Sequence, residues 1–417
     1  MRLSPDDIAA ANKPLLERHS CDFSSLAARL SRDGIDPDSL LRRLGRLEIA
    51  VPSWALAAGG TRFGRFGVPG EPRTIEEKLL DVALLSDLTR HTRSVSLHIP
   101  WDTPRDPRAL SRLASELGLS FDAVNSNTFQ DQDRQKHSYK FGSLSHTDRA
   151  VRSQAVDHNL EVISIGRRLG SRSLTLWLAD GSNFPGQSDF TRAYERTRES
   201  LKRIYAALPA DWRLLIEYKP FEPAFYSTVV SDWGTALLLA TSLGRRALVL
   251  IDLGHHLIGT NIEQIVARLI MRRRLGGFHF NDSRYADDDL SAGSVKPFQL
   301  FLIFVELLGD LDSEACPALM IDTSNNTKDP LEDLIQSLEA IALAHAHALL
   351  LDRDALRQAQ EANDAVRVQE LLADAFRTDV RPLVAEVRRR MGAAVSPLDA
   401  FRRLKVRARL TAERRRR

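Results

Sequence analysis

The chain has 417 residues, 43% of them hydrophobic, which is enough to bury a large core in one α/β barrel with extra helices or in two ordinary domains. Its 58 basic and 55 acidic residues leave a formal charge of only +3, which gives no strong argument for a nucleic-acid partner. Cys21 and Cys316 are too few for a thiolate metal site or a disulfide framework, so we expect both to be buried thiols in a reducing cytoplasm. The start of the chain lacks the apolar core of a signal peptide, and no apolar run reaches the roughly 18 residues of a membrane span.

Residues 1–45 have a polar, helical pattern, and from Leu47 onward short β-branched or aromatic runs alternate with longer amphipathic segments. Such alternation predicts parallel strands joined by crossover helices. Eight strands are expected: Leu47–Trp54, Ser94–Ile99, Phe121–Asn125, Ser173–Leu178, Leu214–Tyr218, Ala247–Asp252, Gly277–Asn281 and Pro317–Asp322. Eight strands of this kind predict an α/β fold with a closed (β/α)8, or TIM, barrel.

The last part of the chain has helical periodicity but no further strand. We therefore expect an N-terminal helical extension over 1–45, a catalytic barrel over 46–350 and C-terminal helices over 351–417, packed on the barrel or on a neighbouring subunit. The closing stretch 402–417 is rich in arginine. We expect a solvated, mobile tail there, with contact to an acidic partner as the alternative.

Ligand-type residues stand at the ends of the later strands. Glu217 and Lys219 are two apart at the end of the fifth strand, so both point to one face, which in a barrel is the lumen. An E-x-K pair is commonly a surface pair, but charges in a lumen are costly unless they serve a site. Asp252 ends the sixth strand, and Gly254 lets the chain turn so that His255 approaches the same point.

Three further points decide the candidate set. His255 and His256 are adjacent and diverge, so only one of them faces a metal, and we favour His255. His279 lies between two phenylalanines and faces away from them, although a histidine satisfied within the core is the alternative. Asp322 ends the eighth strand, where it is either a ligand or the N-cap of the next helix.

An acidic loop completes the set. In an extended segment Asp287 and Asp289 share one side and Asp288 faces away, although acidic loops are often simply solvated. The donors are all oxygen or imidazole, which suits Mn, Mg, Co or Zn. Two ions are implied because the candidate ligands exceed what one ion accepts from protein. The seven candidates are Glu217, Asp252, His255, His279, Asp287, Asp289 and Asp322.

Several long stretches resemble one enzyme family: SLHIPWD (96–102), NSNTFQDQ (125–132), YKFGSLSH (139–146), LWLADGSNFPGQ (176–187), IEYKPFEPAFYSTVVSDWG (216–234), IDLGHH (251–256) and HFNDSRYADDDLSAGSVKPFQLFLIF (279–304). Over nearly its whole length the chain is similar to the L-rhamnose isomerases of the xylose isomerase-like barrel superfamily, in their bacterial branch of broad substrate range. The resemblance implies interconversion of L-rhamnose and L-rhamnulose, and of sugars such as D-allose and D-allulose, by metal-assisted hydrogen transfer between C1 and C2. It also implies a homotetramer.

The resemblance assigns the ligands to two divalent ions, with Mn²⁺ as the first choice. A structural ion is held by Glu217, Asp252, His279 and Asp322, and a catalytic ion by His255, Asp287, Asp289 and the shared Asp252. Whether hydrogen moves as a hydride or through an enediol stays open. In the hydride route Asp287 or Asp289 is the expected proton acceptor, and in the enediol route the expected base is a hydroxide at the catalytic ion.

The resemblance also assigns the substrate pocket. Lys219 contacts the sugar oxygen that gains negative charge, and His98 hydrogen-bonds the substrate. Trp101 and Trp177 form apolar walls, and Phe63, or its neighbour Phe66, closes the pocket of an adjacent subunit.

Three other functions share parts of this pattern. A sugar or sugar-phosphate epimerase also moves a proton beside a carbonyl, but is expected to need one ion. A metal-dependent phosphodiesterase or endonuclease would need phosphate-binding cations, and Lys219 is the one obvious cation in the pattern. A barrel that only binds a ligand does not account for so many ionisable groups around one pocket.

Overall fold

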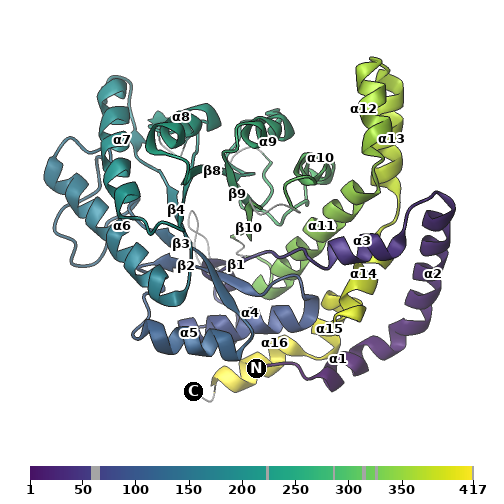
Figure 1. Ribbon diagram of the computed structural model, residues 1–417. Helices are drawn as coiled ribbons and strands as arrows, with labels where there is room; N and C mark the ends of the chain where they lie inside the picture. Colours follow the sequence, from purple (N-terminus) through teal and green to yellow (C-terminus); the bar gives the residue numbers. More distant parts are fainter. Residues whose placement is uncertain (58–65, 222–224, 285–286, 312–315, 325–326, 416–417) are drawn as a thin grey trace.

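The structure is a computed structural model that describes residues 1–57, 66–221, 225–284, 287–311, 316–324 and 327–415 (Figure 1). Its centre is a parallel sheet with strand order β1-β2-β3-β4-β6-β8-β9-β10. A parallel bridge between Ala50 and Met320 joins the first strand to the last and closes the sheet. The strands are β1 Val51–Pro52, β2 Ser94–Ile99, β3 Ser120–Ser126, β4 Ser173–Trp177, β6 Arg213–Glu217, β8 Ala247–Asp252, β9 Leu275–Phe280 and β10 Ala318–Ile321. The predicted TIM barrel is confirmed, although β1 is shorter than expected.

Helices surround the barrel and extend it at both ends of the chain (Figure 1). The helices between the strands are α4 Ile75–Thr89, α5 Pro107–Glu116, α6 Arg149–Leu169, α7 Phe190–Ala207, α8 Trp233–Leu243, α9 Ile262–Met271, α10 Pro297–Leu307 and, after β10, α11 Pro330–Leu350. The terminal helices are α1 Pro5–Asn12, α2 Leu16–Arg32, α3 Pro37–Leu44, α12 Arg353–Glu361, α13 Ala365–Arg377, α14 Arg381–Arg390, α15 Pro397–Arg403 and α16 Val406–Arg415. Two short 3₁₀ helices, Lys13–Leu15 and Ser53–Leu56, complete the set among the described residues.

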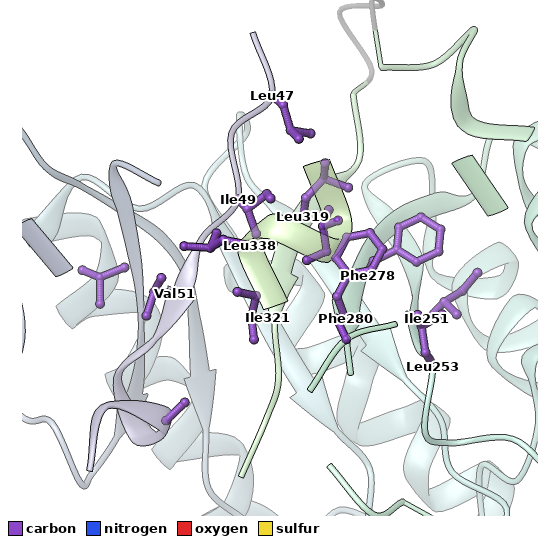
Figure 2. Packing of buried hydrophobic residues seen from close by; sticks show 14 of the residues in the cluster. Leu47, Ile49, Val51, Ile251, Leu253, Phe278, Phe280, Leu319, Ile321 and Leu338 are labelled. Atoms are coloured by element: carbon purple, nitrogen blue, oxygen red, sulfur yellow. The ribbon is translucent and has the colours of Figure 1, made fainter. Parts of the chain in front are cut away.

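Period-two alternation along the strands separates the helix-facing core from the lumen. Figure 2 shows Phe278 and Phe280 of β9 beside Ile321 of β10, and Ile251 of β8 nearby, all in the layer between strands and helices. Phe280 also stacks on Phe304 of α10, with ring centroids 5.7 Å apart. Because successive side chains of a strand point to opposite faces, the residues between these positions point into the barrel.

The lumen is filled near its middle by a small apolar group. Ala123, Leu215 and Leu250 form a buried cluster of their own, separate from the helix-facing core. A Cβ on Gly276 would lie 2.7 Å from the Leu215 side chain, so the backbone of β9 approaches this cluster closely. The polar residues at the carboxyl ends of the strands therefore sit above a packed floor, as in other TIM barrels.

Two expectations from the sequence are wrong. Cys21 is exposed and Cys316 is half-buried, so neither is a buried thiol. The arginine-rich stretch is not a solvated tail over 406–415, since it forms α16 with Leu410 and Arg414 buried. Among the described residues no single helix is long and apolar enough to cross a membrane, and only α11 and α12 taken together, bent by 67°, meet that test.

A small second sheet was not expected from the sequence. β5 Gly181–Ser182 pairs antiparallel with β7 Ser227–Thr228. The two strands lie in the loops after β4 and β6, so they link these loops at the carboxyl end of the barrel, where sites form in this fold.

Candidate metal centre

Four strand ends bring one group of ligand-type side chains together. Glu217 ends β6, Asp252 ends β8, His279 lies in β9 and Asp322 follows β10, and one donor atom from each lies within 4.8 Å of the others. His279 Nδ1 is 3.2 Å from Glu217 Oε1, 3.3 Å from Asp322 Oδ2 and 3.7 Å from Asp252 Oδ2. We call these four residues the first group.

A second group shares Asp252 with the first. Its donors come from Asp252, His255 and Asp287, again all within 4.8 Å. His255 Nε2 is 3.3 Å from Asp287 Oδ1 and 3.9 Å from Asp252 Oδ2, while His255 Nδ1 lies 3.0 Å from the carbonyl oxygen of Tyr218. That carbonyl accepts from Nδ1–H and fixes the tautomer that turns Nε2 toward the two carboxylates.

Asp252 is oriented between the two groups. Its Oδ1 accepts hydrogen bonds from the backbone N–H of Gly254 at 2.7 Å and from the side chain of Asn281 at 2.9 Å. Its Oδ2, the atom nearest both histidines, is buried and has no hydrogen-bond partner among the described residues. A buried carboxylate oxygen without a hydrogen-bond partner is costly, and a bound cation would satisfy it. Oxygen and imidazole donors suit a hard or borderline divalent ion.

The electrostatics of the two groups also favour a cation. Burial alone would lower the pKa of His279, but the carboxylates of Glu217, Asp252 and Asp322 raise it well above the usual value. For His255, too, burial by itself would lower the pKa. The nearby carboxylates of Asp252 and Asp287 outweigh that effect and raise its pKa to about 9. Positive charge is thus stabilised between these carboxylates, which is what a divalent ion would supply with both imidazoles neutral.

Lys219 borders the second group. Its ammonium forms a buried ion pair with Asp287 Oδ2, and it lies 5.1 Å from the ring centroid of Trp177. His256 is held elsewhere, because its Nε2 lies 2.7 Å from the hydroxyl of Tyr218 and burial lowers its pKa to about 4. The structure therefore brings His255 to the carboxylates and leaves His256 apart from them.

A row of aromatic side chains runs beside the two groups. The His98 ring stacks on Trp101 at 4.1 Å and meets Trp54 edge-on at 5.5 Å. Phe129 lies 5.6 Å from His98 and 4.4 Å from Trp177, measured between ring centroids. Burial lowers the pKa of His98 to about 3, so this imidazole is neutral at pH 7. We call Trp54, His98, Trp101, Phe129 and Trp177 the aromatic row.

Some predicted residues are not brought together. Asp289 belongs to neither ligand group among the described residues, although it follows Asp287 by only two positions. The reason is the backbone, since Asp287 and Asp289 have φ of 26° and 50°, so the segment is not extended as we assumed. Asp288 accepts a hydrogen bond from the backbone of Arg284 at 2.5 Å. Phe66 is exposed, and Phe63 lies outside the described residues.

Other contacts were missed by the sequence reasoning. The Trp54 indole donates to Asp322 Oδ1 at 2.8 Å, and the N-cap of α11 is Asp329, so Asp322 is not a helix cap. Asn281 and Phe129 were likewise not singled out. Asn281 follows β9 by one residue, and its position at a strand end was the signal that could have identified it.

Comparison with known proteins places the fold. The family model described as "Xylose isomerase-like TIM barrel" matches residues 90–340. The chain belongs to this family. A probable sugar isomerase of Rhizobium meliloti is 54% identical over 99% of this chain and 97% of its own length. An L-rhamnose isomerase of Rhodopirellula baltica is 24% identical over 57% of this chain and 61% of its own. In its fold this xylose isomerase-like barrel also resembles an L-ribulose 3-epimerase, with a TM-score of 0.55, 16% identity, and coverage of 76% of this chain and 98% of the other.

Proposed function

We propose that the protein is an aldose–ketose isomerase that requires two divalent metal ions, acts on L-rhamnose and L-rhamnulose, and also accepts hexoses such as D-allose and D-allulose. This proposal rests mainly on the two ligand groups that share Asp252, with Lys219 at the edge of the second group. The similarity to a probable sugar isomerase over the whole chain supports the reaction class. The similarity to the more distant L-rhamnose isomerase supports L-rhamnose as the substrate.

The first group fits a structural ion, and the second fits a catalytic ion. Asp289 stands outside both groups, and we propose it as a further ligand of the catalytic ion once that ion is bound. Mn²⁺ is the first choice, with Mg²⁺, Co²⁺ and Zn²⁺ as alternatives. Bound ions would polarise the two neighbouring sugar oxygens that exchange carbonyl and hydroxyl character. Since Asp252 Oδ2 faces both groups, the loss of this one carboxylate is expected to affect both ions.

The protein's own residues perform the remaining tasks. Lys219 lies beside Asp287, so its ammonium stabilises the sugar oxygen on which negative charge develops. Asp287 or Asp289 accepts the proton released when the sugar hydroxyl becomes a carbonyl. Neutral His98 hydrogen-bonds the substrate, and Trp101 and Trp177 cover the apolar face of the sugar.

The test uses protein stripped of metal with a chelator and then reloaded. We expect no conversion of L-rhamnose before reloading, and formation of L-rhamnulose, seen by sugar chromatography, once two equivalents of Mn²⁺ are bound. Full activity of the stripped protein would overturn the proposal. Running the reaction in deuterated water distinguishes the two routes, because solvent deuterium retained at C1 or C2 excludes a pure hydride shift.

Epimerisation is the second candidate, for one specific reason. The first group is a complete set of four donors by itself, and a reaction that needs only one ion could use it alone. Metal analysis decides between the two. Full turnover at one ion per chain, with a ketose converted to its C3 epimer, would favour the epimerase.

A further inference from the structure

A cleft of about 390 Å³ opens next to the aromatic row. Phe129 lines this cleft and also contacts His98, Trp101 and Trp177, so one side chain belongs to both places. None of the seven candidate metal ligands is among the described residues that line it. Its volume lies within the roughly 300–1,000 Å³ of small-molecule sites.

The walls of the cleft come from the loops after β3, β4 and β6, and Asp180 ties these loops together. Its carboxylate accepts hydrogen bonds from the backbone N–H groups of Ser143 and Ser145, both at 2.8 Å. Its carbonyl oxygen accepts from Val229 N at 2.8 Å. Gly142 adopts φ +102°, and a Cβ there would lie 2.7 Å from Ser145 Oγ, so this approach requires glycine.

The cleft is also connected to the candidate catalytic lysine. Gly181 of β5 lines the cleft, β5 pairs with β7, and Thr228 of β7 donates from its hydroxyl to the carbonyl of Lys219. The backbone N–H of Lys219 donates to Val230 O at 3.1 Å. The same loops therefore hold the cleft walls and Lys219 in a fixed relation.

The chemistry of the lining suits a neutral carbohydrate. Phe129, Tyr139 and Phe225 offer aromatic surface, and Gln130 lines the cleft with an amide. A pyranose ring presents an apolar C–H face and a rim of hydroxyls, which such a surface matches. An anion is disfavoured, since Lys140 is accompanied by two carboxylates among the lining residues.

We propose that this cleft binds a second sugar unit, so that the enzyme accepts reducing disaccharides whose aldose carries a glycosyl group on a carbon remote from C1 and C2. The contacts from Lys219 to Trp177 at 5.1 Å, and from Trp177 to Phe129 at 4.4 Å, lead from the reacting end of the sugar to the cleft. The inference rests on the proposed function. The reaction is balanced, because hydrogen moves between C1 and C2 of the reducing unit and the glycosidic bond is untouched.

The test compares L-rhamnose with maltose, lactose and melibiose, with conversion followed by sugar chromatography and binding by calorimetry on the Mn²⁺-loaded protein. Gln130→Trp fills the cleft from an exposed position. Gln358→Trp, exposed on α12, is the matched control. We expect wild type to bind and convert at least one disaccharide. Gln130→Trp should lower kcat/KM and affinity for it about 10-fold or more, with L-rhamnose changed less than about 2-fold.

Two results would overturn the inference. In the first, wild type converts L-rhamnose but neither binds nor converts any of the disaccharides. In the second, Gln130→Trp reduces L-rhamnose and disaccharide turnover alike. If L-rhamnose itself is not converted, the proposed function fails, and calorimetry then tests the sugar-binding cleft separately. Disaccharide binding that Gln130→Trp abolishes would support a sugar site in the cleft. Absence of disaccharide binding would contradict it.

Discussion

Asp252 is the residue on which both ligand groups depend. One of its oxygens is held by Gly254 and Asn281, so the other is directed toward His255 and His279 at 3.9 and 3.7 Å. Asp252→Asn keeps the size of the side chain but removes its charge. We expect loss of both ions and a fall in activity of about 100-fold or more, measured as metal content per chain by elemental analysis and as L-rhamnose conversion. Retention of two ions would contradict the shared role.

Lys219 is expected to act on the substrate rather than on the ions. Lys219→Met keeps much of the apolar stem but removes the ammonium beside Asp287. Turnover should fall by about 10²–10³-fold, as when one stabilising donor is removed from a developing oxyanion. Metal content should stay at the wild-type level, and His255→Ala serves as the contrasting variant that loses the second ion preferentially. Metal loss in Lys219→Met would assign the lysine to site assembly instead.

The orientation of single side chains was predictable only where the backbone was regular. His279 and Asp252 lie in strands, and period-two alternation was enough to turn them into the lumen. Asp287 and Asp289 lie in a loop with positive φ, which residue types do not reveal, so the extended backbone assumed for this segment is not the one found. Trp54 meets Asp322 across 268 positions of sequence, a contact that follows from barrel closure and not from any local pattern.

At the scale of elements the same distinction applies. The eight barrel strands were predictable because each is a distinct apolar run bounded by polar residues. β5 and β7 contain two residues each and are too short to carry a pattern. The helix α16 was missed because its stability depends on a distant partner, since Arg414 pairs with Asp81 of α4 and donates to the carbonyl of Gly70.

The β5–β7 pair offers a test of loop positioning. A Cβ on Gly181 would lie 2.4 Å from the carbonyl oxygen of Ser227, so Gly181→Ala forces the two strands apart. Because Thr228 of β7 is bonded to the Lys219 carbonyl, we expect kcat to fall by about 10–100-fold while the melting temperature of the barrel changes little. Gly309→Ala, where a Cβ meets open space, is the control for both assays. Unchanged kcat in Gly181→Ala would show that the pair has no bearing on Lys219.

Arg414 tests whether α16 supports the barrel. Its ion pair with Asp81 is 2.6 Å long, and the two side chains are 5% and 1% exposed. Arg414→Met would leave a buried carboxylate without its partner, and should reduce the free energy of unfolding by about 3–5 kcal/mol in denaturant titrations. The double variant Arg414→Met, Asp81→Leu should recover part of that loss. If the single variant is as stable as wild type, α16 contributes little to the stability of the barrel, as first expected of a solvated tail.

For the whole molecule, the two ends of the chain meet beside the barrel. Figure 1 shows α2 and α3 next to α14, and contacts between these helices, and between α1 and α15, bear this out. The N-terminal amino group lies 3.4 Å from Glu413, and Arg409 lies 3.4 Å from Asp7. We propose that residues 1–45 and 351–417 form a joint support for the barrel of residues 46–350.

Glu386 of α14 links the N-terminal and C-terminal helices, because it is hydrogen-bonded to His19 of α2 as well as to arginines of its own helix. We expect these contacts to make the stability of the protein depend on pH. Although burial opposes ionisation, hydrogen bonds from Arg389, Arg390 and His19 lower the pKa of Glu386 to about 2. A carboxyl group whose pKa is lower in the folded state stabilises the fold above its ordinary pKa of 4.5, and that stabilisation is lost as the pH falls toward 2. Glu386→Gln should therefore melt at a lower temperature than wild type at pH 7, and the two curves should converge between pH 4.5 and 2. A difference in melting temperature that stays constant down to pH 2 would mean that the contribution of Glu386 is packing and not charge.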